Sequence, residues 1–197
     1  MKNASGGWQQ VDATLRTTAD GAVAPTAVPS QLGFSGGGTG PMATMTTTDG
    51  KKLTLKAPFP LPKPALNGDS ALYPSVLPGV DLELTATPAG GWRQVLIVHT
   101  AEAATSAAVR KLQFPIEADG LTVSADVAGN LKAVDAQGSA RFTAPTPVMW
   151  GLAPGRPPTP ADRGRRAPSP CSPHQPRKSL WRPRPRRAPT APAKAPP

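Results

Sequence analysis

Short runs of alternating apolar and polar residues, separated by glycine-containing turns, constrain the fold of this chain more than any other feature. Residues 80–85 (VDLELT) put three apolar side chains on one face and three polar ones on the other, as in a strand with one buried face. Residues 121–127 (LTVSADV) repeat the pattern, and residues 52–56 (KLTLK) are a shorter copy. Residues 95–98 (VLIV) are apolar at every position, which predicts a central strand buried on both faces.

Turn signals between these runs predict that the strands pair as antiparallel neighbours. The expected turns are Asp20-Gly21, Asp49-Gly50, Asp119-Gly120, residues 128–130 and residues 135–138. The last two turns lead into strands that begin at Leu131 and span residues 139–143. Alternating prolines in residues 58–64 indicate an extended connector, because proline cannot donate to a strand ladder.

One helix candidate remains, residues 101–111, which are rich in alanine and follow Thr100 as a suitable N-cap. The expected fold is therefore mainly β. It is an antiparallel, sandwich-like domain of short strands with at most one short helix, followed by a disordered C-terminal tail.

Charge and proline divide the chain near Trp150. The chain has 22 Lys and Arg, 12 Asp and Glu, and a net charge of +10, and all of that excess lies in residues 151–197. A segment so rich in Arg and Pro, with few aliphatic residues, cannot offset the entropy of ordering its backbone. We expect a disordered N-terminus at residues 1–7, a β-rich module at residues 8–150 and a disordered tail at residues 151–197.

The cysteine content, the N-terminal residues and the apolar runs show neither a disulfide nor a targeting or membrane-spanning segment. Cys171 is the single cysteine, so no disulfide can form within the chain. Residues 1–7 lack the apolar stretch of a signal peptide, and no apolar run is long enough for a membrane span.

Residues 33–37 (GFSGG) fit the G-x-S-x-G nucleophile elbow of serine hydrolases. That motif requires a strand, a sharp turn and a helix, whereas a strand-like sequence follows here. Ser35, Asp81 and His99 occur in the hydrolase order but without the intervening βα units. The context favours a glycine-rich turn.

Three further motifs have simpler interpretations. Residues 38–43 (GTGPMA) fit a loose dinucleotide fingerprint, but no helical pattern follows to receive a pyrophosphate. Asp81 and Glu83 resemble a carboxylate pair, although the solvated face of an amphipathic strand explains them as well. Cys171 and His174 have a metal-like spacing, but a closed zinc site needs four ligands. We expect no catalytic, cofactor-binding or metal-binding residues.

The tryptophans Trp8, Trp92 and Trp150 could stack on sugar rings, and core or edge packing is the alternative. In the tail, Arg182, Arg184, Arg186 and Arg187 could neutralise phosphates, and Trp181 could stack on a base. Nothing patterns these charges, which disfavours nucleic acid as a partner.

Five segments of the chain resemble, in order and spacing, an uncharacterised β-rich module of large secreted or surface proteins of high-GC Gram-positive bacteria. That module occurs with LamG-like jelly-roll and Rhs/YD-repeat domains. The matching segments are residues 8–15 (WQQVDATL), 32–38 (LGFSGGG), 40–44 (GPMAT), 73–82 (YPSVLPGVDL) and 142–150 (FTAPTPVMW). The resemblance implies an extracellular or cell-surface location and a binding, adhesive or structural role, and it carries over no catalytic residues.

The leading expectation is therefore a non-catalytic structural or binding module, a fragment of a larger secreted or cell-surface multidomain protein. Its partners would be neighbouring domains or surface carbohydrate. Nucleic-acid binding through the tail is the alternative, and a serine hydrolase is a third hypothesis. Where the resemblance ends, the composition switches to the mixture that GC-rich DNA gives in a wrong reading frame. We interpret residues from about 151 onward as a frameshift product, which translation of the other frames would test.

Overall fold

The computed structural model describes Met1 and residues 7–151. Residues 1–148 form one compact unit, and a second unit begins at Met149. The predicted disorder of residues 1–7 and 151–197, and the frameshift origin of the tail, depend on residues outside those described. The same is true of Cys171, His174 and the tail residues considered for nucleic-acid binding.

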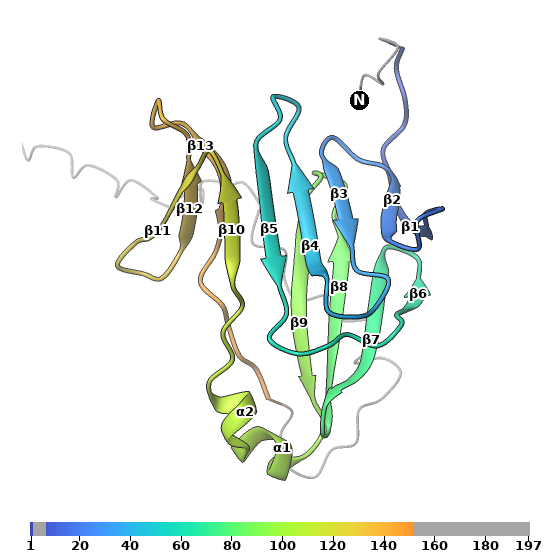
Figure 1. Cartoon of the computed structure of the whole chain (residues 1–197), viewed down its shortest axis with the longest axis vertical. Coiled ribbons are helices and arrows are strands. Elements are labelled where there is room, and N and C mark those ends of the chain that lie inside the picture. Colours follow the sequence, from blue (N-terminus) through green and yellow to red (C-terminus); the bar gives the residue numbers. More distant parts are fainter. Residues whose placement is uncertain (2–6, 152–197) are drawn as a thin grey trace, which may run out of the picture. The chain divides into compact units, whose positions relative to one another are not determined.

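Within the described residues, thirteen strands form three antiparallel sheets (Figure 1). The first sheet holds, in spatial order, β1 (Asp12–Thr17), β2 (Val23–Ala27), β3 (Gln31–Phe34), β4 (Pro41–Thr46), β5 (Lys52–Lys56) and β10 (Ile116–Asp119). The second holds β6 (Ala65–Asn67), β7 (Ser70–Leu77), β8 (Val80–Ala86) and β9 (Trp92–Val98). The third holds β11 (Thr122–Ala125), β12 (Leu131–Val134) and β13 (Ala140–Ala144). The mainly β, antiparallel fold expected from the sequence is confirmed.

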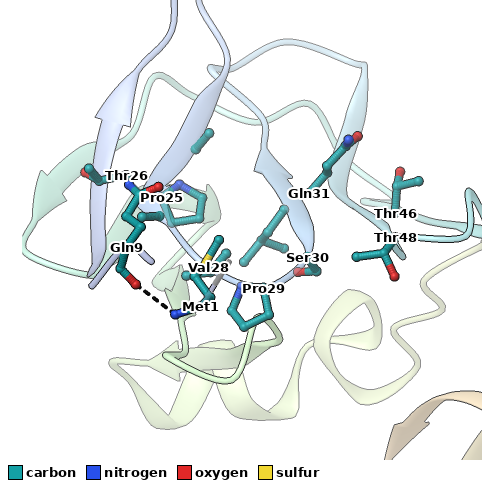
Figure 2. A pocket seen from close by; sticks show the side chains of 13 residues that line it. Met1, Gln9, Pro25, Thr26, Val28, Pro29, Ser30, Gln31, Thr46 and Thr48 are labelled. Carbon is teal, nitrogen blue, oxygen red and sulfur yellow. Dashed lines mark hydrogen bonds between the residues drawn. The ribbon is translucent and has the colours of Figure 1, made fainter. Parts of the chain in front are cut away.

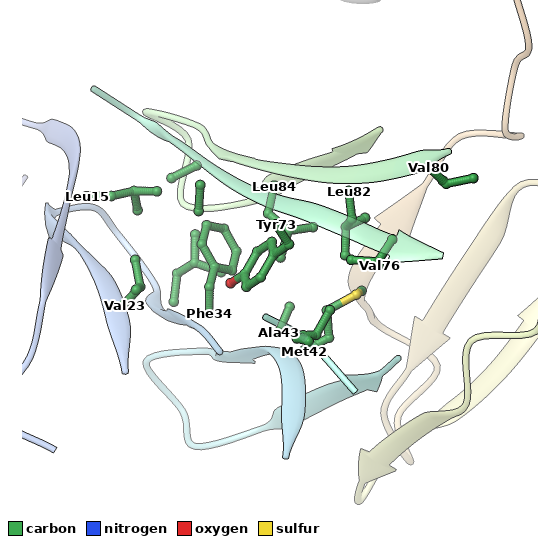
Figure 3. Packing of buried hydrophobic residues seen from close by; sticks show 14 of the residues in the cluster. Leu15, Val23, Phe34, Met42, Ala43, Tyr73, Val76, Val80, Leu82 and Leu84 are labelled. Atoms are coloured by element: carbon green, nitrogen blue, oxygen red, sulfur yellow. The ribbon is translucent and has the colours of Figure 1, made fainter. Parts of the chain in front are cut away.

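The six-stranded and four-stranded sheets bury a shared hydrophobic core between them (Figure 3). Phe34 and Met42 come from the first sheet, and Tyr73, Leu82 and Leu84 come from the second. Removing these large side chains from water is the main favourable term for such a fold. The two layers are those of a sandwich.

The alternating run at residues 80–85 buries the face that its pattern predicts. Val80, Leu82 and Leu84 of β8 have no exposed surface, whereas Asp81 and Glu83 on the opposite face are only half-buried. The run at residues 52–56 does not follow its pattern: in β5 the buried residue is Thr54, and Leu53 and Leu55 are only partly buried, although Leu55 packs against the same core.

Five hairpin turns share one design, in which a Thr or Asp precedes a glycine by three residues. In each turn the glycine N–H donates to the carbonyl of that first residue. The pairs are Thr18 and Gly21, Thr47 and Gly50, Thr87 and Gly90, Asp126 and Gly129, and Asp135 and Gly138. All five glycines have φ of 80–85°. Asp20 and Asp49 do not have positive φ, so their turns are of the three-residue kind with a glycine bulge and not type I′ pairs.

The predicted helix at residues 101–111 forms as two very short helices, α1 (Ala101–Thr105) and α2 (Ala107–Arg110). Thr100 caps α1 as predicted, because its side chain accepts a hydrogen bond from the Ala103 N–H. Ser106 breaks the helix with an extended backbone (φ −62°, ψ 142°) and caps α2. The expectation of at most one short helix is therefore wrong. No described helix has the length and apolarity needed to cross a membrane.

Two other strand predictions are wrong in their burial. Residues 95–98 are not central: β9 is an edge strand of the four-stranded sheet, and none of its residues is fully buried. Residues 121–127 form the shorter strand β11, whose four residues are all exposed. Alternation predicts a strand correctly, but its burial also requires an opposing layer or a neighbouring strand.

Candidate functional site

In the hairpin between β7 and β8, the Asp81 carboxylate has two polar partners, a backbone N–H and a histidine ring. Asp81 accepts a hydrogen bond from the Ser75 N–H at 2.7 Å and lies 2.9 Å from Nε2 of His99. The Ser75 N–H, and then His99, hold the pKa of Asp81 below its usual value. Ser75 has φ of 52°, the one positive φ outside glycine among the described residues. Ser75 lies in a bulge of β7, where the register with β8 shifts between Tyr73 and Leu77. The Asp81 carboxylate therefore stabilises a backbone conformation that is unfavourable for an L-residue.

Residues 73–82, one of the five segments that carry the resemblance, have a structural role at most positions. Tyr73 is fully buried, and its hydroxyl donates to the Ser35 carbonyl at 2.6 Å, which joins the two sheets. Val76 is buried in the same core. Gly79 has φ of 70°, and a Cβ there would lie only 3.0 Å from the Ala103 Cβ, so α1 needs a glycine at this point. The motif holds a hairpin, its bulge and a helix together.

The structure brings Asp81 and His99 together but does not add Ser35. Ser35 is buried, and its hydroxyl bonds only within its own loop, to the Gly37 carbonyl and N–H at 3.2 and 3.0 Å. Its carbonyl receives the Tyr73 hydroxyl from the core side of the four-stranded sheet, whereas Asp81 projects from the opposite face of that sheet. The sheet lies between the serine and the Asp81–His99 pair, so these residues form no catalytic triad.

The other motifs also form parts of the scaffold. Gly38 pairs with Leu61 as an isolated bridge, and Pro41 opens β4, so a strand and not a helix follows the dinucleotide-like sequence. Asp81 and Glu83 do share the outer face of β8, where Thr85 donates to Glu83 at 3.3 Å. No group of three or more metal-binding side chains occurs in the part of the chain that the structure describes.

The three tryptophans do not share one environment. Trp92 packs against the core, whereas Trp8 and Trp150 are 83% and 62% exposed. Trp150 also belongs to the second unit of the chain. Of the three tryptophans, Trp92 alone lies against the hydrophobic core.

A shallow pocket of about 490 Å³ lies beside β2, β3 and the end of β4 (Figure 2). Its wall combines the apolar side chains of Pro25, Val28 and Pro29 with the polar side chains of Gln31 and Thr46. No Lys, Arg, Asp, Glu or His side chain lines it, and its one charged group is the Met1 ammonium, which donates to the Gln9 carbonyl at 2.7 Å (Figure 2). Sequence reasoning missed this pocket because the run that forms most of its lining, residues 24–32, contains no recognisable motif, and its other lining residues are distant in the sequence.

Sequence reasoning also missed an ionic link between the third sheet and the β4–β5 turn. Asp135, whose side chain is 1% exposed, accepts hydrogen bonds from the Ser139 and Gln137 N–H groups and from Nε of Arg141 at 2.7 Å. The Ser139 N–H is the largest cause of its lowered pKa. Arg141 also lies 3.3 Å from Asp49. A recognisable signal was an acid at the start of a predicted turn with an arginine six residues later.

Comparison with protein families, with curated proteins and with solved structures gives no match for this chain.

Proposed function

We propose that residues 8–150 act as a non-catalytic structural or binding module of a larger secreted or cell-surface protein. The observation that carries the proposal is the role of residues 73–82. Tyr73 bonds the two sheets, Asp81 holds the bulge at Ser75, and Gly79 accommodates α1. These residues thus support the architecture of the module, and none of them is left over for a catalytic role.

Uncharged polar and apolar groups predominate in the pocket beside β2 and β3, and surface carbohydrate is the ligand class that fits them. Gln31 and Thr46 are directly paired across β3 and β4, so an amide and a hydroxyl stand side by side next to the apolar wall of Pro25 and Pro29. Sugars offer the same combination of hydroxyl groups and apolar ring faces. The one charged group in the pocket wall, the Met1 ammonium, already donates to the Gln9 carbonyl at 2.7 Å, and no charged side chain lines the pocket.

Calorimetric titration of the full chain with a panel of soluble bacterial polysaccharides tests the binding role. Binding should weaken in Gln31→Ala and in Thr46→Ala. It should be unchanged in Thr105→Ala, which removes an exposed hydroxyl from α1, outside the pocket. Binding that Gln31→Ala and Thr46→Ala leave intact would contradict this assignment.

The hydrolase alternative has its own test. We expect no ester hydrolysis above background with a chromogenic acetate ester. Activity that both Ser35→Ala and His99→Gln abolish would overturn the non-catalytic proposal.

Nucleic-acid binding through the tail is the second alternative. An electrophoretic shift assay with chains that contain or lack residues 151–197 separates it from the main proposal. A shift that requires the tail and disappears with added salt would favour the nucleic-acid function.

A further inference from the structure

Strand β9 presents an open edge whose backbone polarity can be derived from the ladder. β9 pairs only with β8, in an unbroken register from Val80–Val98 to Ala86–Trp92 (Figure 1). The ladder continues beyond both ends of the strands. The His99 N–H donates to the Gly79 carbonyl, and the Thr87 N–H donates to the Gly91 carbonyl, each at 2.9 Å. Because bonded pairs alternate in an antiparallel ladder, the odd-numbered residues of β9 bond β8. The N–H and C=O groups of the even-numbered residues, 92 to 98, therefore face the open side.

The other described edge strands carry features that block pairing with another chain. β1 has an irregular register and two charged residues, and β6 has only three residues. β10 has four residues, two of them acidic, and β11 also has four. β13 carries Arg141 and faces a register shift in its neighbour. β9 has seven residues, no proline, no bulge and a single charge, Arg93, which is the kind of edge that templates a further strand.

The side chains of β9 indicate the same thing. Val95 and Ile97 lie on the outer face, while Leu96 and Val98 lie on the core face with Trp92. None of them is fully buried, and Val98 is 38% exposed. A strand that is apolar on both faces has the sequence of a central strand, and one more strand on its open side would make it central.

We propose that this strand is β9 of a second copy of the same chain, paired antiparallel about a two-fold axis at Val95. Val95 is the midpoint of β9, so this register overlaps the whole strand. It also places even residues opposite even residues, Trp92 opposite Val98 and Gln94 opposite Leu96. These are the residues whose backbone groups face the edge, and both core faces then lie on the same side of one eight-stranded sheet.

Charge favours a second copy as the occupant. On the outer face, Arg93 would stand opposite Ile97 of the second copy, and Ile97 is paired with Asp81 in its own sheet. Asp81 and Glu83 give that face two carboxylates beside β9, and Arg93 is the only cation on β9. The two-fold axis therefore brings each Arg93 toward the acidic side of the other copy. On the core face, Trp92 would cover the exposed Val98 of the second copy.

Sedimentation equilibrium of the full 197-residue chain tests the proposal. The chain should approach twice its monomer mass of 20.3 kDa at micromolar concentrations. Gln94→Pro removes an edge-facing N–H without breaking a bond to β8. Because the symmetry doubles that loss, it should raise the dissociation constant by roughly tenfold or more. Val95→Lys places two like charges at the axis and should leave the chain monomeric.

Val123→Lys is the matched control, because Val123 is 38% exposed in another edge strand, β11. It should leave the dimer intact. The proposal is overturned if the wild-type chain stays monomeric at 100 µM, because roughly that concentration would populate even a weak dimer. A dimer that survives both β9 substitutions, or that Val123→Lys dissociates equally, also overturns it. The proposal does not rest on a ligand for the pocket, so polysaccharide binding and self-association can fail independently.

Discussion

Replacing Tyr73 with phenylalanine should weaken the sandwich by removing one hydrogen bond between its two sheets. The Tyr73 side chain is fully buried, and its hydroxyl donates to the Ser35 carbonyl at 2.6 Å. Tyr73→Phe keeps the ring in the core and leaves that carbonyl without the hydroxyl. The loss of a partner by a buried polar group costs about 1–3 kcal/mol, so we expect a decrease of about 2 kcal/mol in the free energy of unfolding.

Urea unfolding followed by circular dichroism measures this decrease, and thermal unfolding gives a second estimate. For a unit of 148 residues, about 2 kcal/mol corresponds to a fall in Tm of roughly 4–8 °C. Thr105→Ala is the control, because it removes an exposed hydroxyl that donates to the Glu102 carbonyl, and it should change stability by no more than about 0.5 kcal/mol. If Tyr73→Phe changes stability as little as the control, the hydroxyl does not join the sheets.

The ionisation of Tyr73 gives an independent test, since it is the only tyrosine in the chain. Burial raises the pKa of Tyr73 well above the ordinary tyrosine value. The folded protein therefore favours the neutral phenol, and its stability falls as the pH rises above the pKa of the unfolded state. That fall should reach about 1.4 kcal/mol per pH unit above pH ~10. Tyrosinate absorbance at 295 nm should appear only with unfolding, and a normal titration of the folded chain would refute the buried position.

Three further substitutions test the β7–β8 hairpin and the core. Asp81→Asn should lower the free energy of unfolding at pH 7. In the wild type, the Ser75 N–H holds the pKa of Asp81 below its usual value, so the same contribution should be lost as the pH falls through that lowered pKa. Urea unfolding at pH 7 and at pH 3 should therefore show a smaller difference in stability between the two proteins in acid. Gly79→Ala should lower the free energy of unfolding, measured by thermal unfolding, by about 1–3 kcal/mol, because it adds a Cβ against Ala103 at a position of positive φ. An unchanged stability would contradict the contact with α1. Leu84→Ala should cost about 2–5 kcal/mol by urea unfolding, because Leu84 is completely buried, and a loss below 1 kcal/mol would be inconsistent with its place in the core.

The sequence predicted local structure well because the signals involved are local. The alternation at residues 80–85 predicted β8 and its buried face, and the glycines after Asp20 and Asp49 marked real turns. Thr100 predicted the start of α1. Each of these features depends on interactions within a few residues.

The features that were missed depend on contacts between distant segments. The pocket combines the continuous run of residues 24–32 with Thr46 at the end of β4, and the sequence does not reveal that these segments meet. Ser35 could be placed relative to His99 only once the order of the sheets was known. Ser106 broke the predicted helix because its side chain caps α2, and an alanine-rich composition does not reveal where a serine will cap.

The wrong prediction for residues 95–98 differs from the others, because the local pattern was interpreted correctly and the assigned neighbour was wrong. Apolar residues on both faces of a strand predict that both faces are buried. They do not indicate whether the neighbouring strand belongs to the same chain or to another one. Within one copy, β9 has a neighbour on one side only, and its apolar residues remain half-exposed. β11 is also an exposed edge strand, but Ser124 and Thr122 alternate with its apolar residues, so its sequence does not require a second neighbour. The conflict between sequence and position is thus specific to β9, and pairing with a second copy resolves it without any change in the fold of either chain.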